Sequence, residues 1–211
     1  MNEHISSAYD RDLEGITTLI MRMGGLVEEA ILNAAKSLAD HDLELAEKVR
    51  AGDKVIDALE MQINEEAART IALRAPVSKD LRSLLTVLRL AASLERIGDY
   101  AKNIAKRTSV LAEMSPVSGS DAALRRMARE VEQMLKDTLD AYVRGDAVLA
   151  EDVRQRDQEV DQMYNALFRE FLTFMMEDPR NITSCMHLHF MAKNIERMGD
   201  LTTNMAEQVI Y

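Results

Sequence analysis

Apolar residues recur at intervals of three and four positions along almost the whole chain, which is the pattern of amphipathic helices. Helices are expected over residues 10–39 (or from 12), 42–75, 78–112, 121–145, 146–178 and 181–211. Pro76, Pro116 and Pro179 all fall at the expected breaks, where a residue without an amide proton is tolerated. The pattern therefore predicts an all-α fold.

Four polar residues stand just before expected helices and are candidate N-caps, because their side-chain oxygens can accept from free backbone amides. They are Asp42, Ser78, Asp121 and Asp146.

The second half of the chain repeats the first. Residues 94–107, LERIGDYAKNIAKR, match residues 195–208, IERMGDLTTNMAEQ, at a shift of 101 positions (196 − 95). Upstream matches share a shift of 104, as in Asp53 and Asp157. Only one segment is rich in Ser, Pro and Gly, and it lies near residues 114–120. We expect two tandem antiparallel three-helix repeats, over residues 1–113 and 121–211, joined by a linker over residues 114–120.

Composition narrows the location and the partners. The 211 residues carry a net charge of −10, so no basic surface for nucleic acid is expected. Cys185 is the only cysteine, which excludes an intrachain disulfide and favours a reducing compartment. The polar N-terminus does not look like a signal peptide, and we find no apolar run of membrane-spanning length. These features predict a cytoplasmic protein without membrane insertion.

Paired carboxylates are the most telling chemical feature. An i,i+4 spacing places two side chains on one helix face, and the third helix of each repeat is expected to turn this face into its bundle. If the second and third helices of each repeat are antiparallel, four carboxylates fall at one level in each. The first set is Asp53, Asp57, Glu95 and Asp99, and the second is Asp157, Asp161, Glu196 and Asp200.

Four like charges at close range repel one another, and bound cations would remove that cost. All-oxygen ligation suits Mg²⁺, Mn²⁺, Ca²⁺ or a multinuclear iron site, with zinc as a further option. Glu60, Asn103 and Asn204 are possible additional ligands. In the metal-free alternative, lysines and arginines near the motifs pair with the carboxylates. Lys193 stands where the first repeat has Ala92, and a pair between Lys193 and Glu196 would weaken the second site.

The sequence resembles the PhoU family over nearly its whole length. The segments that carry the resemblance are Pro76–Arg82 (PVSKDLR), the two ERxGD motifs at residues 95–99 and 196–200, the DxxxD pairs before them, Asp178-Pro179 and the ending Ile210-Tyr211. The resemblance implies two three-helix bundles related by a pseudo-twofold axis, with metal clusters bound at the E(D)xxxD motifs.

The resemblance also implies a role. It suggests a cytoplasmic negative regulator of phosphate uptake and of the phosphate regulon, linking the ATPase PstB of the phosphate ABC transporter to the sensor histidine kinase PhoR. No catalytic residue is expected, because the chain lacks a Gly-rich phosphate loop and a nucleophile elbow.

Three further interpretations stay open at this level. One is a metal-free helical scaffold with ion-paired carboxylates. Another is a carboxylate-bridged di-metal enzyme, although the chain has no His with a Glu three positions before it. The third is a homodimer, for which a second apolar stripe on residues 90–104 and the segment 168–176 are the candidate contacts.

Overall fold

Six long helices carry most of the chain in the computed structural model, which describes residues 2–210. They are α1 (Asn2–Ala39), α2 (Leu43–Arg74), α3 (Lys79–Leu111), α4 (Ser120–Arg144), α5 (Ala147–Glu177) and α6 (Ile182–Ile210), with a short 3₁₀ helix, η1 (Pro179–Asn181), before α6. Over these residues the structure contains no strand, so the all-α prediction is confirmed.

Two of the four predicted N-caps are confirmed. The Asp42 carboxylate accepts from the amide of Leu45 at 2.9 Å. The Asp146 carboxylate accepts from the amides of Val148 and Leu149, each at 3.0 Å. In both turns the capping oxygen satisfies a backbone donor that has no partner within the helix.

The other boundaries differ from expectation. Ser78 occupies the N-cap position, but with φ 49° its side chain makes no capping hydrogen bond. Asp121 is not a cap, because α4 begins one residue earlier, at Ser120. The N-cap of α4 is Gly119, whose φ of 79° is a left-handed conformation that glycine adopts without a steric penalty. The first helix begins at Asn2 rather than near residue 10.

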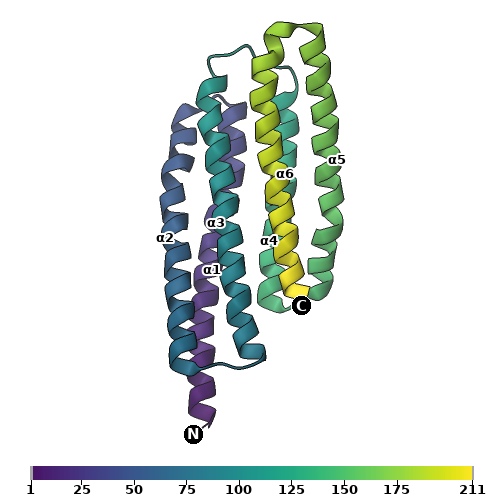
Figure 1. Cartoon of the computed structure of the whole chain (residues 1–211). Helices are drawn as coiled ribbons and strands as arrows, with labels where there is room; N and C mark the ends of the chain where they lie inside the picture. Colours follow the sequence, from purple (N-terminus) through teal and green to yellow (C-terminus); the bar gives the residue numbers. More distant parts are fainter. Residues whose placement is uncertain (1, 211) are drawn as a thin grey trace.

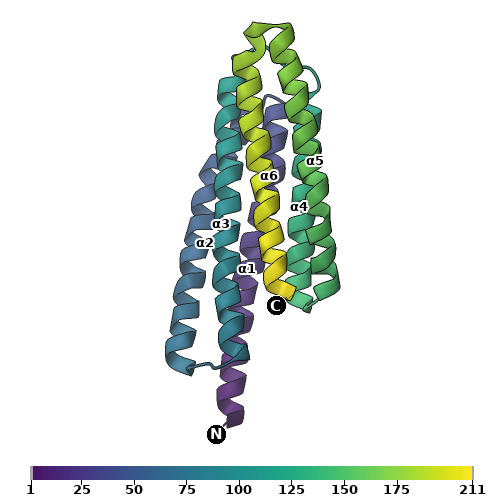
Figure 2. The same ribbon diagram turned by 45° about the vertical axis from the view of Figure 1, so that its right-hand side comes forward.

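Helices α1 to α3 form one antiparallel bundle and α4 to α6 form a second, and the two bundles lie side by side (Figure 1). Helices α1 and α3 of the first repeat contact α4 and α6 of the second. Within residues 2–210, α2 contacts only α1 and α3, while α5 contacts only α4, α6 and η1. The rotated view also shows α2 and α5 at the two outer sides of the molecule (Figure 2). The expected tandem three-helix repeats are therefore present.

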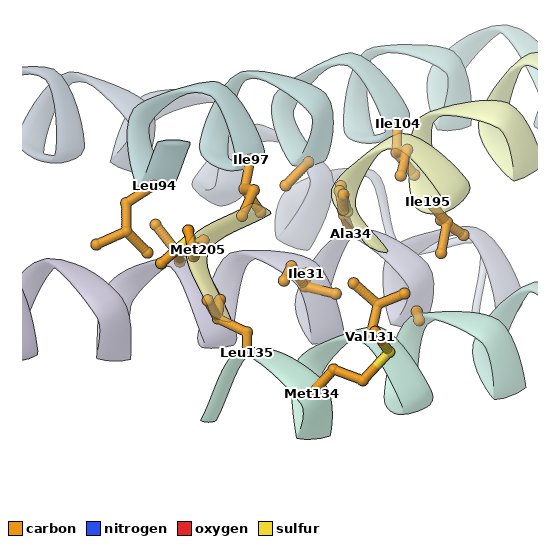
Figure 3. Packing of buried hydrophobic residues seen from close by; sticks show 14 of the residues in the cluster. Ile31, Ala34, Leu94, Ile97, Ile104, Val131, Met134, Leu135, Ile195 and Met205 are labelled. Carbon is orange, nitrogen blue, oxygen red and sulfur yellow. The ribbon is translucent and has the colours of Figure 1, made fainter. Parts of the chain in front are cut away.

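One hydrophobic core runs through both repeats. It gathers apolar residues from the four inner helices (Figure 3), among them Ile31, Ala34, Leu94, Ile97, Ile104, Val131, Met134, Leu135, Ile195 and Met205. Full burial of one such large side chain contributes about 1.5–3 kcal/mol. Because the core is shared, the boundary drawn at residues 114–120 stays a prediction, although residues 112–119 do connect α3 to α4.

The two apolar stripes of α3 are buried to different extents. The stripe Leu90, Leu94, Ile97, Ala101 and Ile104, a candidate for self-association, is buried inside the chain. The stripe that carries Glu95 and Asp99 faces inward only in part, because Leu84 is fully buried, the two carboxylates are half-buried and Ala92 is exposed. Packing of the first repeat against the second decides this difference, because α3 must contact α6 as well as its own bundle.

Candidate carboxylate clusters

The first carboxylate cluster lies between α2 and α3. Asp53 is 3% exposed, and Asp57 is half-buried one turn later on α2. Glu95 and Asp99 are half-buried one turn apart on α3. Gly98 lets the helices approach here, since a Cβ at this position would lie 3.1 Å from Cδ1 of Ile56. The local geometry thus brings together the two helix faces paired from sequence.

Lys102 neutralises part of this cluster. Its ammonium donates to Oδ2 of Asp53 on α2 and, at 3.1 Å, to Oδ1 of Asp99 on α3. The hydrogen bond to Asp53 is the main reason that the pKa of Lys102 is raised. The second oxygen of Asp53, Oδ1, is buried and has no hydrogen-bond partner among the described residues.

The remaining charges in the first cluster act on one another. Burial raises the pKa of Asp57, and the charge of Asp53 raises it further. Burial also raises the pKa of Glu95, followed by the charges of Asp99 and Glu60. The structure therefore brings all four predicted carboxylates, with Glu60 as a fifth, into electrostatic contact.

The second cluster lies at the equivalent level between α5 and α6. Glu196 is 9% exposed and Asp157 is half-buried, whereas Asp161 and Asp200 are exposed. Gly199 admits the neighbouring helix, because a Cβ there would lie 3.3 Å from Oδ1 of Asp157.

Lys193 compensates the most buried charge of the second cluster. It donates to Oε1 of Glu196 at 2.6 Å, as expected from its place in the sequence. Oε2 of Glu196 is buried without a hydrogen-bond partner in residues 8–210. The orphaned oxygen resembles that of Asp53, but it belongs to the third helix of its repeat rather than the second.

Mutual repulsion also links the members of the second cluster. Burial raises the pKa of Asp157, and the charges of Asp200 and Asp161 add to the shift, while the Thr203 hydroxyl opposes it. Burial and the charge of Glu196 raise the pKa of Asp200. The antiparallel level places Thr203 beside Asp157, but the sequence assigned its hydroxyl no role; Thr203 matches Lys102 of the first repeat (203 − 102 = 101).

The described residues do not form a complete metal site. Among them, no three Asp, Glu, His or Cys side chains converge closely enough to hold an ion. Asn103 and Asn204 are exposed on α3 and α6. The donor chemistry nevertheless fits a hard cation, since each cluster offers carboxylate oxygens and includes a buried carboxylate oxygen without a partner among the described residues. The ligand set stays a prediction.

Comparison with known proteins places this architecture in a family. The family model described as "PhoU domain" matches residues 20–108 and 124–209, one match for each repeat. The chain belongs to the PhoU family. Each matched segment contains one complete carboxylate cluster, so the repeat read from the sequence is also the repeat of the PhoU domain.

Curated PhoU relatives match along essentially the whole chain. A protein from Caulobacter vibrioides (strain NA1000 / CB15N) is 46% identical over 211 residues, which are 100% of this chain and 92% of that protein. One from Rhizobium meliloti (strain 1021) is 46% identical over 99% of this chain and 88% of that protein. Both are described as phosphate-specific transport system accessory protein PhoU homologues.

Solved PhoU structures share the fold. PhoU from Pseudomonas aeruginosa superposes with a TM-score of 0.93 at 38% identity, covering 96% of this chain and 97% of that one. The phosphate transport system regulatory protein PhoU from Streptococcus pneumoniae gives 0.89 at 30% identity, covering 96% of this chain and 95% of that one. PhoU is a family of transport accessory proteins rather than enzymes, so the di-metal enzyme interpretation is set aside.

No helix in the described part of the chain combines the length and the apolar character that crossing a bilayer requires.

Proposed function

We propose that this chain is a non-enzymatic regulatory accessory protein of a phosphate-specific transport system. The observation that carries the proposal is the full-length similarity to PhoU accessory proteins, at 46% identity for two of them. In this role it works in the cytoplasm as a negative regulator of phosphate uptake and of the phosphate regulon. It acts as an adaptor between the transporter ATPase PstB and the sensor histidine kinase PhoR.

Complementation tests this role directly. The chain is expressed in a bacterium that lacks its own PhoU protein, and a phosphate-regulon reporter is measured in phosphate-rich medium. We expect the reporter to be repressed and binding to purified PstB and PhoR to be detectable. A reporter that stays fully active, with neither protein bound, would contradict the proposal.

The carboxylate clusters supply a second proposal, that each binds divalent or multinuclear metal ions of the class Fe, Mn, Mg or Zn. Asp53, Asp57, Glu95 and Asp99 would hold the first site, and Asp157, Asp161, Glu196 and Asp200 the second. Two observations support this: the mutual repulsion of the carboxylates and the orphaned oxygens of Asp53 and Glu196. A bound cation would supply positive charge that ties α2 to α3 and α5 to α6.

Elemental analysis separates this proposal from the metal-free scaffold. We expect stoichiometric metal in the wild type, lost from one half in Asp57→Ala/Glu95→Ala and from the other in Asp161→Ala/Glu196→Ala. The observed lysine pairs favour the scaffold as the competing interpretation. Absence of metal after incubation with Mn²⁺, Fe²⁺ and Zn²⁺ would leave ion pairing as the role of these residues.

A third proposal is that the chain forms a homodimer through an exposed apolar stripe at the α5–α6 hairpin. The residues of this α5–α6 stripe recur every four positions on each helix: Phe168, Leu172 and Met176, then Ile182, Met186 and Phe190. They are 37–77% exposed. A second copy is the occupant we favour, because a patch built from uncharged apolar side chains is complementary to itself across a twofold axis.

The equivalent surface of the first repeat provides the control for this proposal. On α2 the matching positions hold the small or polar residues Asn64, Ala68 and Ala72. We expect Leu172→Ser/Phe190→Ser to convert the dimer to a monomer in light scattering after gel filtration. Leu85→Ser, at the exposed position equivalent to Met186, should leave the dimer unchanged. A monomeric wild type would contradict the proposal.

A further inference from the structure

A cavity of about 670 Å³ lies where the two repeats meet, away from the carboxylate clusters. Its walls come from α1, the first turns of α3, the α4–α5 turn and the C-terminal end of α6. Arg82 in this cavity and Asp99 in the first cluster are 17 residues apart on α3, which corresponds to about 25 Å along the helix axis. The cavity is thus a separate feature, large enough for a ligand of nucleotide size.

The cavity is lined by positive charge on a chain that is acidic overall. Lys79, Arg82 and Arg144 line it, and no Asp or Glu is among its lining residues in the described chain. Lys79 and Arg82 form no salt bridge with any described residue, while Arg144 has only a 3.6 Å contact with Asp140. For a protein of net charge −10, three cations gathered without lining carboxylates leave a local positive potential that an anion can neutralise.

Further polar groups lie beside these cations. Lys79 and Arg82 belong to the first turn of α3, whose free backbone amides add positive partial charge. Thr86 follows on the same helix and lines the cavity too. A smaller adjoining cavity of about 220 Å³ shares Arg82 and brings in Arg89, which donates to Gln208 on α6 at 2.6 Å. Arg and Lys near hydroxyl groups are typical of sites that hold phosphate oxygens.

Besides the wall that carries the cations, the cavity has an apolar wall. Leu13 of α1, Tyr142 of α4 and Val209 of α6 line it. Burial raises the pKa of Tyr142, so its phenol stays protonated and its ring presents an uncharged face. An occupant that fits both walls has an anionic end for the cations and a ring or apolar body for Tyr142.

We propose that this cavity binds a small phosphate ester of nucleotide size, with its phosphate against Lys79 and Arg82 and its ring against Tyr142. The ligand contacts α1 and α3 of the first repeat together with α4 and α6 of the second. Its binding therefore stabilises one relative position of the two repeats. This goes beyond the adaptor role and does not depend on metal in the carboxylate clusters.

Titration calorimetry on the full chain tests the proposal, with EDTA present so that metal at the carboxylates does not contribute. The probes are ATP, adenosine and inorganic phosphate at physiological salt. We expect ATP to bind at least tenfold more tightly than either fragment, because only ATP reaches both walls. No binding of ATP at millimolar concentration would overturn the proposal, and equal affinities for ATP and inorganic phosphate would overturn the role of the apolar wall.

Variants locate the site. Arg82→Ala and Lys79→Ala should each weaken ATP binding about tenfold, and Arg82→Lys should restore part of the loss. Tyr142→Leu should weaken ATP but not inorganic phosphate. The matched control is Arg180→Ala, which removes an exposed cation at the position equivalent to Lys79 in the second repeat (180 − 79 = 101). An equal loss in Arg180→Ala, or none in Arg82→Ala, would place the binding elsewhere. Circular dichroism melting verifies that each variant is folded.

Discussion

The two carboxylate clusters occupy equivalent positions in the two repeats, yet each is neutralised differently. In the first, Lys102 lies three residues after Asp99 and joins α2 to α3. In the second, Lys193 lies three residues before Glu196 and forms its ion pair within α6, while its ammonium lies 5.1 Å from the centre of the Tyr164 ring on α5. The carboxylates and the glycine of each motif recur at a fixed shift, whereas the lysine does not. The repeated unit is therefore the acidic pair with its close helix approach, and the cation is added to each half independently.

This difference has a mechanical consequence. The Lys102 ammonium connects two helices, so the first cluster helps to hold its hairpin together. The Lys193 ammonium leaves Asp157 on α5 without a lysine partner among the described residues. A cation bound from solution would therefore join the carboxylates of α5 to those of α6, which no lysine bridges among the described residues, but would replace the Lys102 bridge in the first repeat.

The largest effect on stability is expected where the outer helices, α2 and α5, differ in core packing. Phe171 on α5 is fully buried, and its equivalent on α2 is the buried residue Ala67 (171 − 67 = 104). Phe171→Ala should lower the free energy of unfolding by about 3–5 kcal/mol, because it leaves a cavity in the second hairpin. Urea unfolding measures the loss. Val148→Ala, at an 82% exposed position of α5 outside the proposed dimer stripe, is the control and should cost clearly less; equal losses would mean that Phe171 is not a core anchor.

The next effect separates the two lysines. Lys102→Met should lower the free energy of unfolding of metal-free protein by about 1–3 kcal/mol, because it leaves the buried carboxylate of Asp53 without its cationic partner. The figure is discounted because Lys102 is itself 41% exposed. Lys193→Met should cost less, since that lysine compensates one carboxylate rather than two.

Thermal denaturation in EDTA measures both losses, with the exposed Lys54→Met as control. Added Mn²⁺ should restore more stability to Lys102→Met than to the wild type if cations bind at the carboxylates. A Lys193→Met loss that exceeds that of Lys102→Met would reverse the comparison.

The helix caps give a smaller contrast. Asp42→Ala and Asp146→Ala should each cost about 1 kcal/mol of stability, because each leaves amides of the first helical turn without an acceptor. Asp146→Ala should cost more, since its carboxylate accepts from two amides and that of Asp42 from one. Asn at either position retains an acceptor and should cost little. Equal losses of unfolding free energy for Asp42→Ala and Asp146→Ala in chemical denaturation would show that the second hydrogen bond of Asp146 does not add to stability.

The smallest effect concerns Glu28 of α1 and its repeat equivalent Glu132 of α4. Burial raises the pKa of Glu28 above 4.5, and the charge of Glu132 raises it further, although Lys136 opposes the shift. A carboxyl group whose pKa is raised on folding holds its proton more tightly in the folded state. The free energy of unfolding of the protein therefore falls as the pH rises from about 4.5 through the folded pKa of Glu28.

Glu28→Gln should therefore raise the free energy of unfolding at pH 7 by less than about 1 kcal/mol. The gain should disappear below pH 4, where the protonated Glu28 of the wild type is as uncharged as the glutamine of the variant. Melting temperatures of the two proteins across this pH range provide the measurement, and a gain that persists at low pH would point to packing rather than charge.

Several features of the site were predictable because they depend on local spacing. Glu95 and Asp99 share a helix face through their i,i+4 interval, and the short turn after α2 brings Asp53 to their level. The pairing of Lys193 with Glu196 follows from an i,i+3 interval in the same way. Interactions within one helix or one hairpin involve few degrees of freedom, so sequence positions nearly determine them.

Burial of the same carboxylates was not predictable. Asp53 is almost inaccessible, while its repeat equivalent Asp157 is half-buried and Asp161 is exposed. The two carboxylates of each pair have the same i,i+4 spacing on α2 and on α5. The difference in burial therefore arises from how each hairpin packs on its inner helices. The different burial of the two apolar stripes of α3 also comes from tertiary packing, here of the first repeat against the second, because both stripes satisfy the helical period.

The sequence by itself determined the helices, the Asp42 and Asp146 caps, the internal repeat and the level at which each set of carboxylates gathers. All of these depend on residues that lie within one helix or across one tight turn. Only the tertiary structure decided which stripe of α3 is buried, which oxygens of Asp53 and Glu196 lack partners, and that Lys79, Arg82 and Tyr142 line one cavity. Those features require segments far apart in the chain to meet, and the free energy that selects their arrangement comes from burial of the shared core.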